Sequence, residues 1–121
     1  FRDAEKHGLP AEPGMLIIRF EGRLVFANAS HFEETVLDAL SESPETRAII
    51  FQADSINEID ATGEETLRNL ISELRKNGIS VAVSEAKWRV FETLKSAGFF
   101  KCLPEDCFFR TTAEAYDSLR R

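Results

Sequence analysis

Two short apolar runs separated by an amphipathic segment constrain the fold of this chain more than any other feature of its sequence. Residues 48–51 and 79–83 are apolar at nearly every position, which is typical of strands covered on both faces. Between them, residues 67–74 carry apolar side chains at the spacing of a helix buried along one face. Strands that alternate with helices need crossover connections, so the sequence predicts an α/β fold with a mostly parallel central sheet.

Shorter segments complete the expected order of elements. Met15 to Phe20 and Leu24 to Phe26 favour two strands, and the turn between them predicts an antiparallel β-hairpin at the sheet edge. The segment from Ser55 to Ile59 is expected to be a polar loop. The order predicted from these patterns is β-β-α-β-α-β-α-β-α. The later elements are a helix from Ser30 to about Ser43, a helix opened by residues 84–87 and ended by Gly98, a strand at 107–109 and a helix after Thr111.

Three helix starts carry a capping-box pattern, in which a hydroxyl residue and a glutamate three positions later satisfy each other's backbone N–H groups. Thr62 is the hydroxyl residue of the longest expected helix. A hydroxyl at an exposed helix N-terminus lies where unpaired N–H groups can hold an anion, including a phosphate on the hydroxyl itself. The other interpretation is that Thr62 is only a cap, worth about 1 kcal/mol to the helix. The three pairs are Ser30 with Glu33, Thr62 with Glu65, and Thr111 with Glu114.

Composition excludes several classes of function. A chain of 121 residues that is 43% hydrophobic and 30% charged fits one globular domain with one core. The net charge of −6 argues against a nucleic-acid partner, because phosphate contacts need clustered Lys and Arg. The longest apolar runs are strand-sized, so no direct insertion into a membrane is expected.

No arrangement of catalytic or metal-binding residues is evident. Cys102 and Cys107 have a spacing that matches neither a CxxC redox pair nor a zinc site, so half-buried or buried free thiols are expected. His7 and His31 have no third ligand within sequence reach. The chain also has no P-loop, GxGxxG or GxSxG motif. The sequence therefore predicts neither an enzyme, nor a metal site, nor a bound cofactor.

Parallel α/β sheets gather ligands and partners at the carboxyl ends of their strands, next to helix N-termini. The loops that follow three of the expected strands should therefore lie on one rim, with Asn28, Thr62 and Ser84 as neighbours. Thr66 and Asn69 are a candidate partner-binding face on the long helix. The candidate anion-binding or partner-binding loop comprises Asn28, Ser55, Asn57, Asp60, Ala61, Thr62, Gly63 and Ser84.

The order of elements, with the sequence IDATG at residues 59–63 before the long helix, resembles a STAS domain. STAS domains occur as anti-anti-sigma factors and at the cytoplasmic C-terminus of SulP-type anion transporters. Residues 13–20 (PGMLIIRF) and 24–32 (LVFANASHF) resemble the SulP pattern of a PG-led strand followed by FANA and an aromatic residue. Residues 1–13 are similar to the linker from a preceding membrane domain. The resemblance thus implies a linker at 1–13 and a STAS domain at 14–121.

This resemblance implies a regulatory and interaction domain of a SulP-type transporter of sulfate or a related anion. Its partner would be the membrane domain of its own transporter, on the cytoplasmic side of the inner (plasma) membrane. Acyl carrier protein, a kinase and a nucleotide are further candidate partners. An acidic domain would attract an acidic carrier only through a local basic or apolar patch. Trp88, Phe99 and Phe100 are either that patch or part of the packing of the last helices.

The resemblance also assigns a candidate phosphoacceptor. In anti-anti-sigma factors the loop reads Asp-Ser-Ser-Gly, and the second serine is the kinase target. Asp60 to Gly63 occupy these four positions, so the resemblance implies Thr62 as the acceptor. Threonine in place of serine, Ala61, and the like charge of Glu64 and Glu65 depart from that pattern. The alternative function is a free-standing anti-anti-sigma-like switch protein that is phosphorylated at Thr62.

Overall fold

A four-stranded parallel sheet forms the middle layer of the protein. The structure is a computed structural model that describes residues 13–19, 22–24 and 28–120. The strand order is β1-β3-β5-β6, and Ile50 of the central strand β3 lies opposite Ile17 on one side and Ala82 on the other. The predicted mostly parallel α/β sheet is confirmed. Its strands are β1 (Met15–Arg19), β3 (Ala48–Gln52), β5 (Ser80–Ser84) and β6 (Phe108–Phe109).

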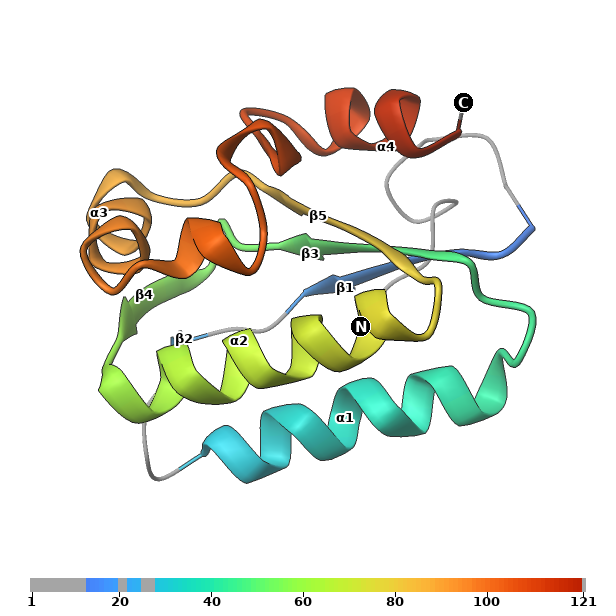
Figure 1. Ribbon diagram of the computed structural model, residues 1–121, viewed down its shortest axis with the longest axis horizontal. Helices are drawn as coiled ribbons and strands as arrows, with labels where there is room; N and C mark the ends of the chain where they lie inside the picture. Colours follow the sequence, from blue (N-terminus) through green and yellow to red (C-terminus); the bar gives the residue numbers. More distant parts are fainter. Residues whose placement is uncertain (1–12, 20–21, 25–27, 121) are drawn as a thin grey trace.

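Helices cover both faces of this sheet (Figure 1). The larger core lies on the side of α1 and α2, where Val36 and Ile71 are fully buried against the sheet together with Ile49. The smaller core lies under α4, where Tyr116 packs with Ile50. The helices are α1 (Ala29–Glu42), α2 (Ala61–Lys76), α3 (Trp88–Ser96) and α4 (Thr112–Arg120), with short 3-10 turns η2 (Phe99–Lys101) and η3 (Glu105–Cys107).

The expected antiparallel hairpin is wrong. In the described residues, β1 pairs in parallel with β3, whereas β2 (Gly22–Leu24) pairs in parallel with β4 (Ile56–Ile59) in a separate two-stranded sheet. Figure 1 shows β1 and β2 following each other along β3 and β4. The first four residues of β1 are all buried, because both faces of this edge strand are covered, as is typical of a parallel sheet and not of a hairpin with one solvated face. Residues 20–21 and 25–27, where the expected hairpin had its turn and strand end, lie outside the described residues.

β4 occupies the segment that was expected to be a polar loop. Ile56 and Ile59 point into the core, and the polar residues Asn57 and Glu58 between them are exposed. Its backbone is paired through Gly22, whose N–H donates to the carbonyl of Ser55 at 2.9 Å. The observed order is therefore β-β-α-β-β-α-β-α-β-α, one strand longer than the predicted order.

Only one of the three predicted capping boxes is present. At the start of α4, the Thr111 hydroxyl accepts from the N–H of Glu114 at 3.1 Å, and the Glu114 carboxylate accepts from the N–H of Thr111 at 3.2 Å. Helix α1 begins earlier than expected, so Asn28 is its N-cap and Ser30 lies inside the first turn. The expected linker at 1–13 lies, apart from Pro13, outside the described residues.

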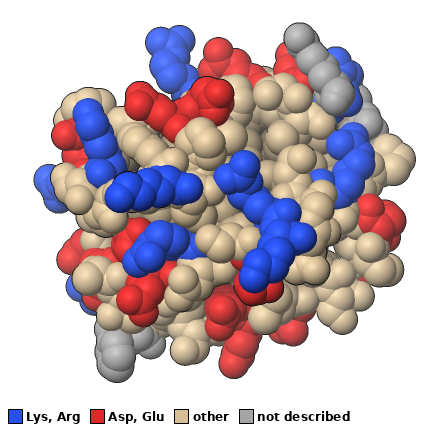
Figure 2. Space-filling model, viewed as in Figure 1, with Lys and Arg blue, Asp and Glu red and all other residues tan. Residues whose placement is uncertain are grey.

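Charge is unevenly distributed over the surface. Figure 2 shows Lys and Arg side chains crossing one face, from the side of α3 to the C-terminal end of α2, with acidic side chains mostly around them. The protein as a whole carries a net charge of −6. A local basic surface therefore exists on an acidic domain.

Candidate functional site

Asp60 holds the start of α2. Its Oδ1 atom accepts a hydrogen bond from the backbone N–H of Gly63 at 2.7 Å, so Asp60, and not Thr62, is the N-cap. The reason is that β4 ends at Ile59, which leaves Asp60 extended and Thr62 already helical. Thr62 is half-buried, and its hydroxyl has no hydrogen-bond partner among the described residues. Thr62 thus lies at the predicted helix N-terminus with a hydroxyl that capping does not use.

An ion pair with a buried carboxylate follows directly after this loop. Glu64, in the first turn of α2, is only 4% exposed. Arg68, one turn later, donates from Nε to Oε2 at 2.9 Å and from Nη2 to Oε1 at 3.2 Å. These hydrogen bonds, followed by charge attraction, hold the pKa of Arg68 above its usual value. The pair supplies the counter-charge without which a buried carboxylate would be costly.

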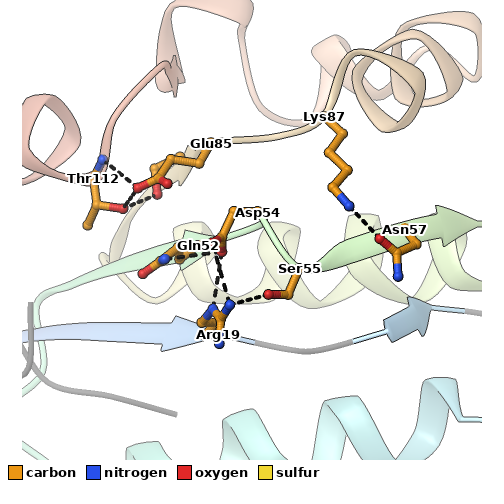
Figure 3. A network of polar contacts seen from close by, with 9 residues as sticks. Arg19, Gln52, Asp54, Ser55, Asn57, Glu85, Lys87 and Thr112 are labelled. Carbon is orange, nitrogen blue, oxygen red and sulfur yellow. Dashed lines mark hydrogen bonds and ion pairs between the residues drawn. The ribbon is translucent and has the colours of Figure 1, made fainter.

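Arg19 organises the carboxyl ends of β1 and β3 (Figure 3). Its Nε donates to Oδ1 of Asp54 at 3.2 Å, and its Nη2 donates to the hydroxyl of Ser55. Gln52 donates to the same Asp54 oxygen at 3.1 Å. Burial raises the pKa of Asp54, but the hydrogen bonds from Arg19 and Gln52 and the charge of Arg19 together outweigh it, so that the pKa is lowered. Ser55, a predicted site residue, is thus part of a structural network.

The expected cluster of Asn28, Thr62 and Ser84 divides into two groups. Asn28 and the start of α2 follow the paired strands β2 and β4, so they share one edge of the small sheet. Ser84 instead ends β5 in the large sheet, is fully buried, and pairs with the hydroxyl of Thr112 at 2.8 Å. Its predicted place in the loop after this strand is wrong, because β5 extends one residue further than its apolar run and α4 covers its end.

Asn57 connects the small sheet to α3. Its Oδ1 accepts a hydrogen bond from Nζ of Lys87, the N-cap residue of α3, as Figure 3 shows. Both residues are exposed. The sequence did not predict this contact, because no local pattern relates two residues that are thirty positions apart.

A groove between α1 and α2 lies next to the predicted partner face. Asn69 lies on its rim and Leu70 on its floor, while Thr66 is half-buried nearby on α2. Leu37 of α1 also lines it and is 49% exposed. The groove has an apolar floor and a polar rim, the composition expected of a protein-binding surface. The other lining residues are Glu33, Leu40, Ser43, Pro44, Thr46, Glu73, Leu74, Asn77 and Ile79.

The aromatic residues Trp88, Phe99 and Phe100 differ in how deeply they are buried. Phe99 is fully buried and Phe100 is half-buried, as packing of the last helices requires. Trp88 is 72% exposed. Phe99 and Phe100 therefore belong to the packing, whereas the assignment of Trp88 to a patch stays a prediction.

The described residues hold no group of three His, Cys, Asp or Glu side chains suited to a metal ion. Cys102 and Cys107 are free and half-buried, as predicted. Burial, and secondarily the charge of Asp106, raises the pKa of the Cys107 thiol, which makes it a weak nucleophile. Among the described helices, none has the length and apolarity needed to cross a membrane.

Sequence comparison identifies the family. The model of the STAS domain matches residues 8–115. The chain belongs to the STAS domain family. A Mycobacterium tuberculosis protein named "Probable sulfate transporter" is 31% identical over 110 residues, which cover 90% of this STAS domain chain and 20% of that protein. The chain thus spans about a fifth of the length of that relative.

Solved structures agree. The STAS domain of a SulP transporter from Vibrio cholerae has a TM-score of 0.74 and 27% identity, over 96% of this chain and 89% of that one. An anti-sigma factor antagonist from Mycobacterium paratuberculosis has a TM-score of 0.75 at 16% identity, over 93% and 91% of the two chains, which shows the shared fold alone. The predicted STAS fold and the predicted resemblance to the SulP type are confirmed.

Proposed function

We propose that this STAS domain is the regulatory and interaction domain of a SulP-type anion transporter, on the cytoplasmic side of the inner membrane. The observation that carries the proposal is the similarity, over nearly the whole of both chains, to the STAS domain of the Vibrio cholerae SulP transporter. The similarity to the Mycobacterium tuberculosis protein named "Probable sulfate transporter" supports sulfate or a related anion as the cargo. The role is binding and not catalysis, and the partner is the membrane domain of the same transporter.

The groove between α1 and α2 is the surface that we assign to this partner. Leu37 and the apolar floor would supply the water-excluding contact, and Asn69 on the rim would supply polar contacts. The groove is lined by the C-terminal half of α2, and its first α2 residue, Asn69, lies seven positions after Thr62 on the same helix. A change at the start of α2 can therefore alter the docked surface through one rigid helix.

Phosphorylation of Thr62 is the switch that we assign to this element. The free hydroxyl is half-buried at the helix N-terminus, where the helix dipole favours a phosphate. The carboxylates of Asp60 and Glu65 are two and three positions away and would repel it. The helix dipole would thus attract a phosphate on Thr62, and the nearby carboxylates would repel it. We therefore expect phosphorylation to change the conformation of the first turn of α2.

Docking is tested in the intact transporter. Asn69→Arg places a long charged side chain on the groove rim and is expected to change anion uptake while leaving the melting temperature of the domain unchanged. Ser118→Arg, at another exposed position, on α4, is the matched control and should leave uptake unchanged. Wild-type uptake by a folded Asn69→Arg transporter would remove the groove from the mechanism.

The switch is tested separately by mass spectrometry of transporter purified from its native cells. Phosphate is expected on Thr62 and absent from the Thr62→Ala variant. Uptake by Thr62→Ala and Thr62→Glu transporters should differ in opposite directions from wild type. Phosphate on another residue only, or equal uptake by both variants, would eliminate Thr62 as the switch.

A further inference from the structure

The most exposed large apolar side chain of the described residues is Trp88, at the start of α3. Its indole stacks on Phe91, with ring centroids 5.7 Å apart and an interplanar angle of 22°. Phe91 in turn contacts Phe100 at 5.3 Å and Phe108 at 5.6 Å. The indole of Trp88 therefore stacks on a cluster of phenylalanine rings and stays exposed to solvent instead of covering the core.

Unpaired positive charges lie on the same helix as this tryptophan and on the turn that follows it. Within the described part of the chain, the Lys and Arg side chains that form neither an ion pair nor a hydrogen bond are Arg89, Lys95, Lys101 and Arg110. Three of these four lie on α3 or η2, and η2 packs on α3. Figure 2 shows basic side chains on this side of the molecule.

The local charge is opposite to the charge of the whole protein. Between residues 87 and 101 the sequence holds four Lys or Arg residues and only one acidic residue, Glu92. Lys87, the fourth cation, hydrogen-bonds to the neutral side chain of Asn57 and not to a carboxylate. This segment is net positive in a chain of net charge −6.

Helix geometry aligns the aromatic ring with the cations. Trp88 and Lys95 are seven positions apart, so they lie on the same face of α3, two turns from each other. Arg89 is exposed beside them, whereas Val90 and Leu94 are buried on the opposite face. One side of α3 is therefore anchored in the core, and the other presents an indole together with unpaired cations.

We propose that this surface, formed by Trp88, Arg89, Lys95 and Lys101, contacts an anionic lipid surface at the level of the headgroups. Tryptophan prefers the membrane–water interface, and clustered Lys and Arg are attracted to anionic lipids. A protein partner would bury an apolar patch of several side chains, and here Trp88 is the single largely exposed one. The proposal rests on the proposed function only in that a transporter domain works next to a bilayer.

The test uses this 121-residue chain and lipid vesicles without transporter. Sedimentation is measured with vesicles of phosphatidylcholine alone and with vesicles that contain one quarter phosphatidylglycerol. The chain should bind the anionic vesicles and not the neutral ones, and added salt should weaken binding. Trp88 is the only tryptophan, so its emission reports the contact and should shift to shorter wavelength on binding.

Substitutions test whether the surface of Trp88, Arg89, Lys95 and Lys101 is responsible for binding to anionic vesicles. Lys95→Gln and Lys101→Gln should each weaken binding about fivefold, and Glu92→Gln should strengthen it several-fold. Arg120→Gln on α4, across the sheet, is the matched charge control and should bind like wild type. Equal binding to both vesicle types, an unshifted emission, or equal weakening by Arg120→Gln would overturn the proposal. None of these outcomes bears on the Asn69→Arg uptake test, so the two proposals fail independently.

Discussion

The carboxylate of Glu85 accepts two hydrogen bonds from Thr112, the first residue of α4. The backbone N–H donates to Oε2 at 3.1 Å and the hydroxyl donates to the same atom at 2.5 Å. Glu85 also has φ of 60°, the only positive value among the described non-glycine residues. A strained residue after β5 thus fastens α4 to the sheet, directly beside the buried pair of Ser84 and Thr112.

Two substitutions of Glu85 distinguish the free-energy cost of its positive φ from the contribution of its hydrogen bonds to stability. Glu85→Ala should lower the free energy of unfolding by about 1–3 kcal/mol, because two bonds to a charged acceptor are lost while the positive φ remains. Glu85→Gly loses the same bonds but adopts this φ freely, so its loss should be smaller by about 1 kcal/mol. Urea denaturation measures both values. Equal losses would mean that the positive φ costs nothing.

Asp60→Ala should lower the free energy of unfolding by about 1 kcal/mol, because the N–H of Gly63 loses its cap. Thr62→Ala should have a smaller effect, since the Thr62 hydroxyl caps nothing. Thermal and urea unfolding of the two variants are compared with wild type. The reverse ranking would show that Thr62 is the cap.

Arg68→Ala should lower the melting temperature more than Arg120→Ala does. The carboxylate that Arg68 pairs with has a side chain only 6% exposed, whereas the partner of Arg120 is 58% exposed and stays hydrated without it. Adding Glu64→Gln to Arg68→Ala should recover part of the loss, because a neutral amide costs less to bury than a carboxylate. If the two single variants unfold at the same temperature, burial of Glu64 has no energetic consequence.

The pKa of Asp54 predicts an acid dependence of stability. Its folded pKa lies below the ordinary value of 3.8, so the unfolded chain binds the proton more readily. The contribution of Asp54 to stability is complete above that ordinary value and is lost as the pH falls through the folded pKa. In Asp54→Asn the difference in melting temperature from wild type should therefore be largest at pH 5–6 and shrink toward pH 3. A constant difference across this range would contradict the assignment.

The elements that the sequence predicted are those whose own side chains determine them. β3 is apolar at its first four positions, and α2 carries Leu67, Leu70, Ile71 and Leu74 on one face, so each pattern was sufficient. The cap of α4 was also predicted, because both of its partners lie within four residues. Local patterns therefore account for the layers of the fold and for the helix start that carries Thr62.

The missed features depend on distant residues. β4 has two adjacent polar residues, Asn57 and Glu58, which break the alternation of a half-buried strand, and its pairing with β2 decides the structure. The sequence predicted Thr62 as the cap, but Asp60 suits the position equally well. Which of the two caps the helix depends on where β4 ends. The contact of Arg19 with Asp54 joins segments that no local pattern relates.

The parallel pairing of every described strand has a consequence for how fast this domain folds. Met15 must meet Ala48, and Ala48 must meet Ser80, before the central sheet has three strands. Each meeting closes a loop that contains an entire helix, and no local hairpin among the described residues lowers that entropic cost. The sheet therefore assembles late, after the chain as far as β5 has been made. During synthesis, the apolar residues of β1 therefore stay unpaired until β3 has been made.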